Sequence, residues 1–182
     1  GRGSFEEDMP AYGIFRQGKT YVDPETGEFL GINADDIGTV DIVEVEGDIA
    51  TMHLTRTTQE ARIGDRLFAS EERAVNSTFM PSSPETEVDG VILDVPRGVT
   101  QIGQFDVVTL NKGARDGLKD GNVLAVYKTG ETVRDRVTGE NVKIPDERSG
   151  LLMVFRTYDK LSYGLILQAT RSLAVSDKVR NP

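Results

Sequence analysis

The sequence predicts an all-β protein made of two related β-barrel-like or sandwich units, and three observations support that prediction. A shift of 112 residues aligns 12–69 with 124–181 without a gap, which indicates an internal duplication. Apolar and polar residues alternate along several segments, as they do in half-buried strands. Turn signals rich in Gly, Pro and Asp separate these segments.

The repeat is clearest around one tight turn. Its matched residues are Gly18, Thr20, Asp23, Thr26, Gly27 and Glu28 in the first copy and Gly130, Thr132, Asp135, Thr138, Gly139 and Glu140 in the second. Further matches are Gly38/Gly150, Thr58/Thr170, Asp65/Asp177 and Leu67/Val179. Ten of the 58 aligned pairs are identical, and convergence of two hairpins on one turn is the alternative explanation. Apolar character is also kept far from the turn, for example at Leu54/Ile166 and Ile63/Val175, which favours a true duplication.

Four parts follow from this alignment. They are 1–11, a tag remnant or truncated start; 12–69, the first β-repeat; 70–89, a linker or long exposed loop; and 90–182, the second and more complete β-repeat. The linker prediction depends on 81–87, which is rich in Ser, Pro and Glu. The first copy has no counterpart to 90–120. If the duplication is real, we expect the equivalent strands upstream of Gly1 in a longer protein.

Two long hairpins are predicted at equivalent places in the repeats. Alternation predicts strands at 38–45 and 48–55 in the first copy, and at 151–157 and 161–170 in the second. The second hairpin is more apolar, with Leu165, Ile166 and Leu167 consecutive, so we expect it nearer the centre of its sheet. Further strands are predicted at 91–93, 105–110 and 122–128.

The segment Asp23–Glu28 carries the signals of a hairpin turn. Pro24 presets φ, Asp23 can cap the turn backbone, and Gly27 can take a left-handed conformation. Calcium binding by Asp23, Glu25 and Glu28 is the functional alternative. An EF-type loop needs several more oxygen ligands at fixed positions, so no metal site is expected here.

Composition limits the classes of function. The chain has 30 acidic and 21 basic residues and a net charge of -9, whereas a nucleic-acid partner requires a basic surface. The absence of cysteine excludes disulfides and thiolate chemistry. No apolar run is long enough to span a bilayer, and the first residues lack the apolar core of a signal peptide.

No pattern of catalytic residues stands out. The single histidine, His53, lies between Thr51 and Thr55 on the polar side of a predicted strand. The sequence has no Gly-x-Ser-x-Gly motif that would support a Ser-His-Asp site with it. The segment Gly113–Gly121 lacks the Gly-Lys-Ser/Thr ending of a phosphate loop and leads into a strand. Carboxylate pairs such as Asp35-Asp36 and Glu71-Glu72 lack apolar shelter that would tune a general acid. We therefore expect no catalytic residues, no cofactor and no enzymatic activity.

Several motifs together resemble a known family. They are Tyr12-Gly13-Ile14-Phe15-Arg16, Asp23-Pro24-Glu25-Thr26-Gly27-Glu28, Ile63-Gly64-Asp65-Arg66-Leu67, 102–108 (IGQFDVV) and 145–157 (PDERSGLLMVFRT). In this order they resemble the region downstream of the LysM module in exported LysM-containing proteins of proteobacteria. The resemblance covers about 12–177.

The resemblance implies a location in the periplasm or cell envelope. In that family a signal peptide and a LysM module precede this region, and the LysM module recognises N-acetylglucosamine of peptidoglycan. Gly64-Asp65-Arg66-Leu67 approaches the start of a LysM module, but no apolar helical stripe follows it. No glycan-binding residue is therefore transferred to this chain, and peptidoglycan is expected as a partner only through a LysM module outside it.

Two functional hypotheses follow. The first is a non-enzymatic envelope accessory region of a LysM-type protein, which acts as a spacer or docks another envelope protein. The alternative is an envelope carbohydrate-binding module or hydrolase, with Asp65 and Asp177 lining a cleft between the repeats. Each of these carboxylates is also explained as the end of a turn before the last strand of its repeat.

Overall fold

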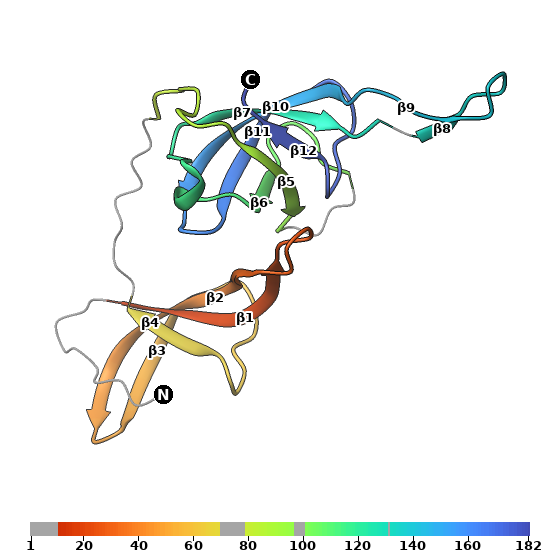
Figure 1. Ribbon diagram of the computed structural model, residues 1–182. Helices are drawn as coiled ribbons and strands as arrows, with labels where there is room; N and C mark the ends of the chain where they lie inside the picture. The colour runs from red at the N-terminus through yellow and green to blue at the C-terminus, as the bar shows by residue number, and fades with distance from the viewer. Residues whose placement is uncertain (1–10, 70–78, 97–100, 131) are drawn as a thin grey trace. The chain divides into compact units, whose positions relative to one another are not determined.

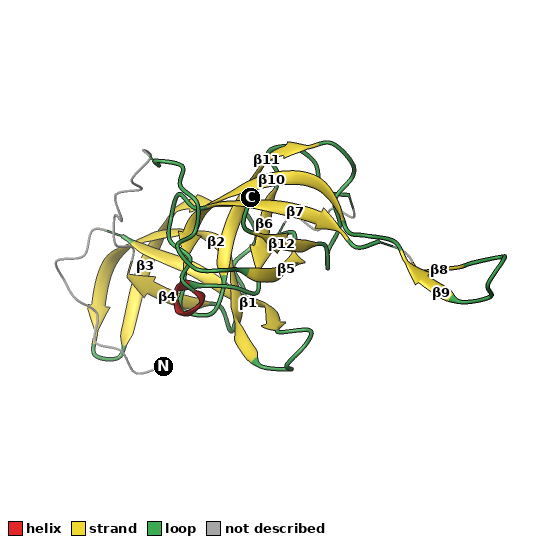
Figure 2. Cartoon of the chain, turned by 45° about the horizontal axis from the view of Figure 1, so that its top comes forward, coloured by secondary structure: helices red, strands yellow, loops and turns green. Residues whose placement is uncertain are grey.

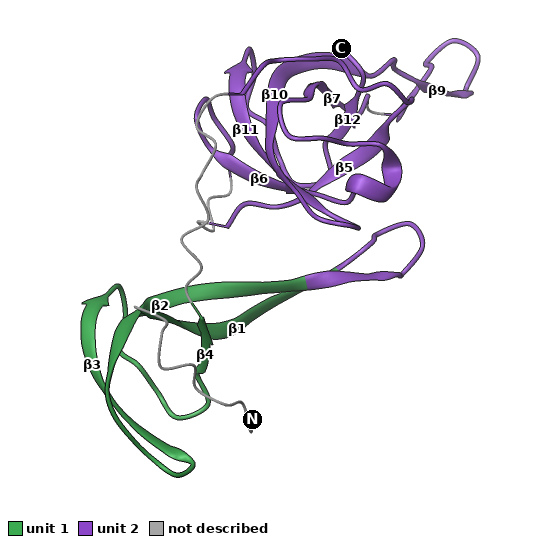
Figure 3. Ribbon diagram, turned by 90° about the vertical axis from the view of Figure 1, so that its left-hand side faces the viewer, with its two compact units in different colours: residues 1–21, 32–75 green, residues 22–31, 76–182 purple. Residues whose placement is uncertain are grey.

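The computed structural model describes residues 11–69, 79–96, 101–130 and 132–182 (Figure 1). Within these ranges almost all regular structure is strand, and the short 3-10 helix η1 (Ala114–Asp116) is the sole helical segment (Figure 2). The predicted all-β class is therefore confirmed. The chain divides into two compact units, 1–21 with 32–75 and 22–31 with 76–182 (Figure 3). Residues 22–31, which include the turn between the first two strands of the chain, thus belong to the second unit.

The first unit is built on an open four-stranded sheet. Its strands are β1 (Tyr12–Val22), β2 (Phe29–Glu46), β3 (Ile49–Thr57) and β4 (Arg66–Ala69), in the order β3-β2-β1-β4. The strands β3 and β4 are therefore the two edges of this sheet. A small core on one face consists of Tyr12, Ile14, Ile37 and Val40, with Ile42 and Met52 partly buried against it.

The second unit contains a closed six-stranded barrel. Its strands are β5 (Asp89–Asp94), β6 (Val107–Leu110), β7 (Val123–Lys128), β10 (Glu147–Thr157), β11 (Ser162–Ala169) and β12 (Lys178–Arg180), in the order β10-β11-β6-β5-β12-β7. The barrel interior is the main core; its fully buried members include Ile92, Val108, Leu110, Leu124, Leu152, Ile166 and Val179. Closure leaves no edge strand, so each strand is paired on both sides.

A two-stranded ribbon leaves the barrel between β7 and β10. It consists of β8 (Thr132–Arg134) and β9 (Asn141–Lys143) and projects away from the barrel in Figure 1. Its tip repeats the turn of the first hairpin: Gly27 and Gly139 have φ of 73° and 76°, and each donates its N–H to the Asp four residues earlier at 2.9 Å. The left-handed backbone of both glycines is the reason that glycine occurs at both places.

The two sheets share one strand pairing at the offset of 112 residues. In the first unit Gly38 pairs with Thr57 and Val40 with Leu54; in the barrel Gly150 pairs with Ala169 and Leu152 with Ile166. The extra residues at the two register shifts are also equivalent: Thr55 in β3 and Leu167 in β11 at the first shift, and Val43 in β2 and Phe155 in β10 at the second. The pairing of β1 with β4 likewise matches the pairing of β7 with β12.

Side-chain contacts repeat as well. The hydroxyl of Thr58 donates to the carbonyl of Ile37 at 3.1 Å, and that of Thr170 donates to the carbonyl of Ser149 at 3.0 Å. Phe15 contacts Phe68 edge to face, with ring centroids 5.8 Å apart. At the equivalent positions of the barrel, the guanidinium of Arg180 lies 5.7 Å from the centroid of the Tyr127 ring in a cation–π contact. These equivalences are what a duplication requires, and the duplication itself stays a prediction.

Part of the predicted linker is attached to the barrel. Residues 70–78 lie outside the described residues, but Ser82 bridges to Asn122, and Val88 is buried. Lys119 also forms an ion pair with Glu85 at 2.8 Å. The composition of 81–87 is that of a mobile linker, but neighbouring backbone supplies partners that composition does not reveal. Residues 79–88 thus form a loop that contacts the barrel, and the division of the chain at 70–89 stays a prediction.

Candidate docking site

Asp65 is held by its own turn. Its carboxylate accepts hydrogen bonds from the backbone N–H of Arg62 and from the side chain of Arg16, each at 2.8 Å. The hydrogen bond from Arg16 is the main reason that the pKa of Asp65 is lowered. The carboxylate therefore stays ionised and saturated with donors, which suits a structural role rather than a proton-transfer role.

Asp177 has the equivalent place in the second unit. Its carboxylate accepts the N–H of Ala174 at 2.8 Å, and its backbone N–H donates to the carbonyl of Ala174 at 3.2 Å. Burial raises the pKa of Asp177, an effect opposed by the Ala174 N–H and by the charge of Lys128. Both carboxylates proposed to line a cleft thus close turns, each within its own unit.

The same four-residue turn occurs four times among the described residues. In each turn the third residue has a positive φ, and the fourth residue is an Asp or Asn whose side chain accepts the backbone N–H of the first residue. The four turns are 62–65, 103–106, 119–122 and 174–177, and the positive φ belongs to Gly64, Phe105, Gly121 and Ser176. Each turn leads directly into the next strand or bridge, so it fixes where that strand starts.

The single histidine is exposed on an edge strand. His53 lies in β3 opposite Asp41, and no group of three or more His, Asp or Glu side chains within the described residues is placed to hold a metal ion. The loop Gly113–Gly121 forms η1 and one of the four turns before β7. The N–H of Gly113 donates to Asp116 at 2.9 Å, so it is not directed at a ligand.

The acidic residues of the first turn bind basic and amide side chains of the barrel. Asn111 donates to Asp23 at 2.8 Å, and Arg115 makes two hydrogen bonds of 2.7 Å to Glu28. Lys160 lies 2.8 Å from the same Glu28 carboxylate. These contacts fasten the hairpin tip to the second unit, of which it is part.

The two carboxylates respond differently to these contacts. Arg115 and Lys160 lower the pKa of Glu28 to about 2. Burial raises the pKa of Asp23, but hydrogen bonds from Thr26, Asn111 and Glu25 outweigh burial and lower it. Sequence reasoning considered these acids as calcium ligands and missed their protein partners, because Arg115 and Lys160 are distant along the chain.

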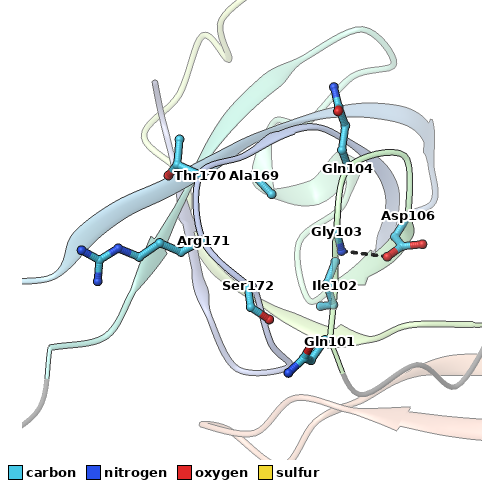
Figure 4. Close-up of a pocket in the computed structure, with 9 residues that line it drawn as sticks. All are labelled: Gln101, Ile102, Gly103, Gln104, Asp106, Ala169, Thr170, Arg171 and Ser172. Carbon is cyan, nitrogen blue, oxygen red and sulfur yellow. Dashed lines mark hydrogen bonds between the residues drawn. The ribbon is translucent and has the colours of Figure 1, made fainter.

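A polar hollow of about 500 Å³ lies at one side of the barrel (Figure 4). Its lining includes Gln101, Gln104, Asp106, Thr170 and Arg171. Most of these polar groups already have protein partners. Gln104 donates to the carbonyl of Leu167, Asp106 accepts from Gly103, and Arg171 forms an ion pair with Glu147. The hollow therefore offers few groups dedicated to a ligand.

The open sheet is the feature that distinguishes the first unit from the barrel. In the barrel, β11 pairs with β6 and β12 pairs with β5, whereas their counterparts β3 and β4 are edges of their sheet. No strand among the described residues pairs with the outer side of either edge. Unpaired N–H and C=O groups along such edges are available to another chain.

Apolar side chains that the barrel buries are uncovered in the first unit. Leu54 is 42% exposed, whereas the equivalent Ile166 is 0% exposed. Leu67 is 38% exposed, whereas the equivalent Val179 is 0% exposed. We call the exposed surface formed by Leu54, Leu67 and the edges β3 and β4 the open face. The apolar character of these positions is kept in both repeats, so the sequence alone does not separate the exposed pair from the buried pair.

Comparison with known proteins does not assign the chain. No protein-family model matches it, and a search of curated proteins finds no match. The resemblance to the region downstream of LysM modules therefore stays a prediction. Among the described residues, no helix combines the length and apolar character that crossing a membrane requires.

Proposed function

We propose that this chain is a non-enzymatic accessory region of the cell envelope that docks another protein on the open face. The uncovered apolar side chains of the first unit carry the proposal. Full burial of an exposed leucine side chain is worth about 1.5–3 kcal/mol. Leu54 and Leu67 are 42% and 38% exposed, so each offers a partner less than half of that amount. The unpaired edges β3 and β4 supply directional hydrogen bonds beside them.

The envelope location rests on the family resemblance alone. In this proposal a LysM module outside the chain holds it at peptidoglycan, and the closed barrel acts as a spacer. The barrel suits that role because its core is enclosed and its strands have no free edge. Its polar hollow does not require a ligand for this role.

Capture of envelope proteins tests the docking proposal. The chain is immobilised and incubated with envelope extracts, with and without crosslinking, beside the variants Leu54→Asn and Ile49→Asn. Ile49 is an exposed apolar residue of β3 on the face opposite Leu54, so it is the matched control. A partner that is retained by the wild type and Ile49→Asn but lost by Leu54→Asn supports docking. Equal capture by all three, or no capture, contradicts it.

Carbohydrate binding is the second candidate, because the hollow beside Gln101, Gln104 and Arg171 is polar. We propose it only as an alternative to docking. Titration of the isotope-labelled chain with muropeptides checks it by NMR, with product analysis for cleavage. Chemical-shift changes at Gln101 and Gln104 would favour it. The absence of both shift changes and cleavage would remove it.

A further inference from the structure

The barrel of the second unit shows what would cover the open face. Two strands, β5 and β6, lie between β11 and β12 and close the barrel. They fill its interior with Ile92, Val108 and Leu110, which are at most 1% exposed. The first unit contains the equivalents of β7, β10, β11 and β12 with the same pairing, but among its described residues no strand is equivalent to β5 or β6.

From this comparison we infer that the open face binds an antiparallel pair of β-strands of another protein, which closes the first unit into a six-stranded barrel. The inference rests on the proposed docking function and names the occupant. The bound pair carries apolar residues at alternate positions, as β6 does at Val108 and Leu110, and polar residues between them.

The barrel also specifies the register of the bound strands. Ser162–Leu165 of β11 pair with Leu110–Val107 of β6, so residues 50–53 of β3 are the equivalent pairing segment. Lys178–Arg180 of β12 pair with Val91–Asp89 of β5, so residues 66–68 of β4 receive the other strand. His53 lies within the first of these segments, and its ring protons provide a single reporter signal.

The exposed side chains and the unpaired strand edges fit a strand pair better than a helix. A helix could cover Leu54 and Leu67, but it could not pair with the free backbone groups of both edges. Two strands satisfy both requirements at once. The equivalent face of the barrel shows that sheet geometry permits it, since Ile166 and Val179 are completely buried there.

The test uses the full chain and a synthetic peptide of residues 88–112, which contains β5 and β6. Two peptide variants are compared with it. Val108→Asn/Leu110→Asn alters the residues directed into the barrel, and Val107→Asn alters the adjacent residue that is only partly buried. Binding to the isotope-labelled chain is followed by NMR and by amide hydrogen exchange.

We expect one peptide to bind per chain, with amide protection gained at 50–53 and 66–68 and a shift of the His53 ring signals. The double variant of the peptide should bind about tenfold more weakly or worse, because two buried apolar contacts become polar. Val107→Asn should bind nearly as well as the unaltered peptide. These peptide variants leave the folding of the chain unaffected.

Two results would overturn the inference. One is absence of binding, or binding that leaves residues 50–53 and 66–68 unchanged. The other is self-association of the chain through β3 that the peptide does not displace, since the occupant would then be a second copy. If the peptide fails while capture from envelope extracts still depends on Leu54, the strand-pair inference fails and the docking function stands.

Discussion

At the scale of single residues, the identities kept between the two copies mark side chains that serve the backbone. Asp65 and Asp177 accept the first N–H of equivalent turns, and Thr58 and Thr170 donate to equivalent carbonyls. Gly27 and Gly139 both have left-handed backbone. Apolar positions need only be apolar and of suitable size, so they vary between copies. Sequence identity therefore reports local geometry here rather than a shared active site.

Asp177 provides a first prediction. Asp177→Asn should keep or increase stability at pH 7, because an amide oxygen can accept the Ala174 N–H without a buried charge. Asn122 already accepts the N–H of Lys119 in this way, at 2.8 Å. Asp177→Ala loses the hydrogen bond and should cost about 1–3 kcal/mol. Urea unfolding of the three proteins measures both effects.

The pH dependence of Asp177 has a defined sign. Burial raises the pKa of its carboxyl, so its contribution to stability is largest below the unfolded pKa and falls as pH rises through the folded value. The advantage of Asp177→Asn over the wild type should therefore shrink as the solution is acidified. An advantage that grows in acid would contradict the assignment of burial as the dominant cause.

Glu28 gives the opposite behaviour. Because its folded pKa is about 2, the contribution of Glu28 to stability is complete above the ordinary carboxyl pKa. That contribution is lost as the pH falls from the ordinary carboxyl pKa through about 2. Acidification should release the hairpin tip from Arg115 and Lys160, which NMR of the Arg115 side chain can follow. Glu28→Gln should remove this acid transition. Glu140→Gln, at the equivalent exposed place in the second turn, should leave it unchanged.

At the scale of elements, the sequence predicted strands better than it predicted their partners. Alternation identified 38–45 and 48–55, which lie within β2 and nearly coincide with β3. The consecutive apolar residues 165–167 fall in β11, which is paired on both sides, whereas the equivalent strand β3 is an edge. Alternation reports which face is buried but not which strand lies alongside. The open face was therefore not predicted.

Close strand approach at Gly150 gives a prediction for this scale. A Cβ atom there would lie 2.6 Å from the carbonyl oxygen of Gln168 on the paired strand. Gly150→Ala should therefore displace β10 from β11 and cost about 1–3 kcal/mol. The comparison is Gly103→Ala, where the nearest atom to the new Cβ is 3.8 Å away. Similar unfolding midpoints for the two variants would show that the strands move apart at little cost.

At the scale of the molecule, the two units should differ in stability. The barrel has a closed hydrogen-bonded ring and a core of fully buried residues, whereas the first unit has two free edges and a smaller core. Amides exchange with solvent through local opening, which is easiest where few contacts must break. Amides of β3 should therefore exchange faster than those of β11 under native conditions. Equal protection of the two strands would contradict this and would indicate that β3 already has a cover.

The partner and the cellular location lie beyond what sequence or fold can predict. Ten shared identities indicated the common architecture, and strand pairing reproduces it in detail. Binding is proposed at Leu54 and Leu67, whose equivalents in the barrel are buried, and sequence patterns do not reveal which of two equivalent positions is covered. Leu54 is identified as a candidate binding residue only by comparison with Ile166, which is fully buried at the equivalent position of the barrel.

The shared pairing has a practical consequence. Leu54 and Ile166 occupy equivalent positions in the strand pairing, but Leu54 is partly exposed and Ile166 is buried. The same chain therefore allows a comparison of this position with and without two closing strands. Truncation of a fully buried leucine or isoleucine to alanine lowers the free energy of unfolding by about 2–5 kcal/mol, and truncation of a partly exposed one lowers it much less. The difference between Ile166→Ala and Leu54→Ala, measured in a single protein, estimates the apolar contribution of two closing strands.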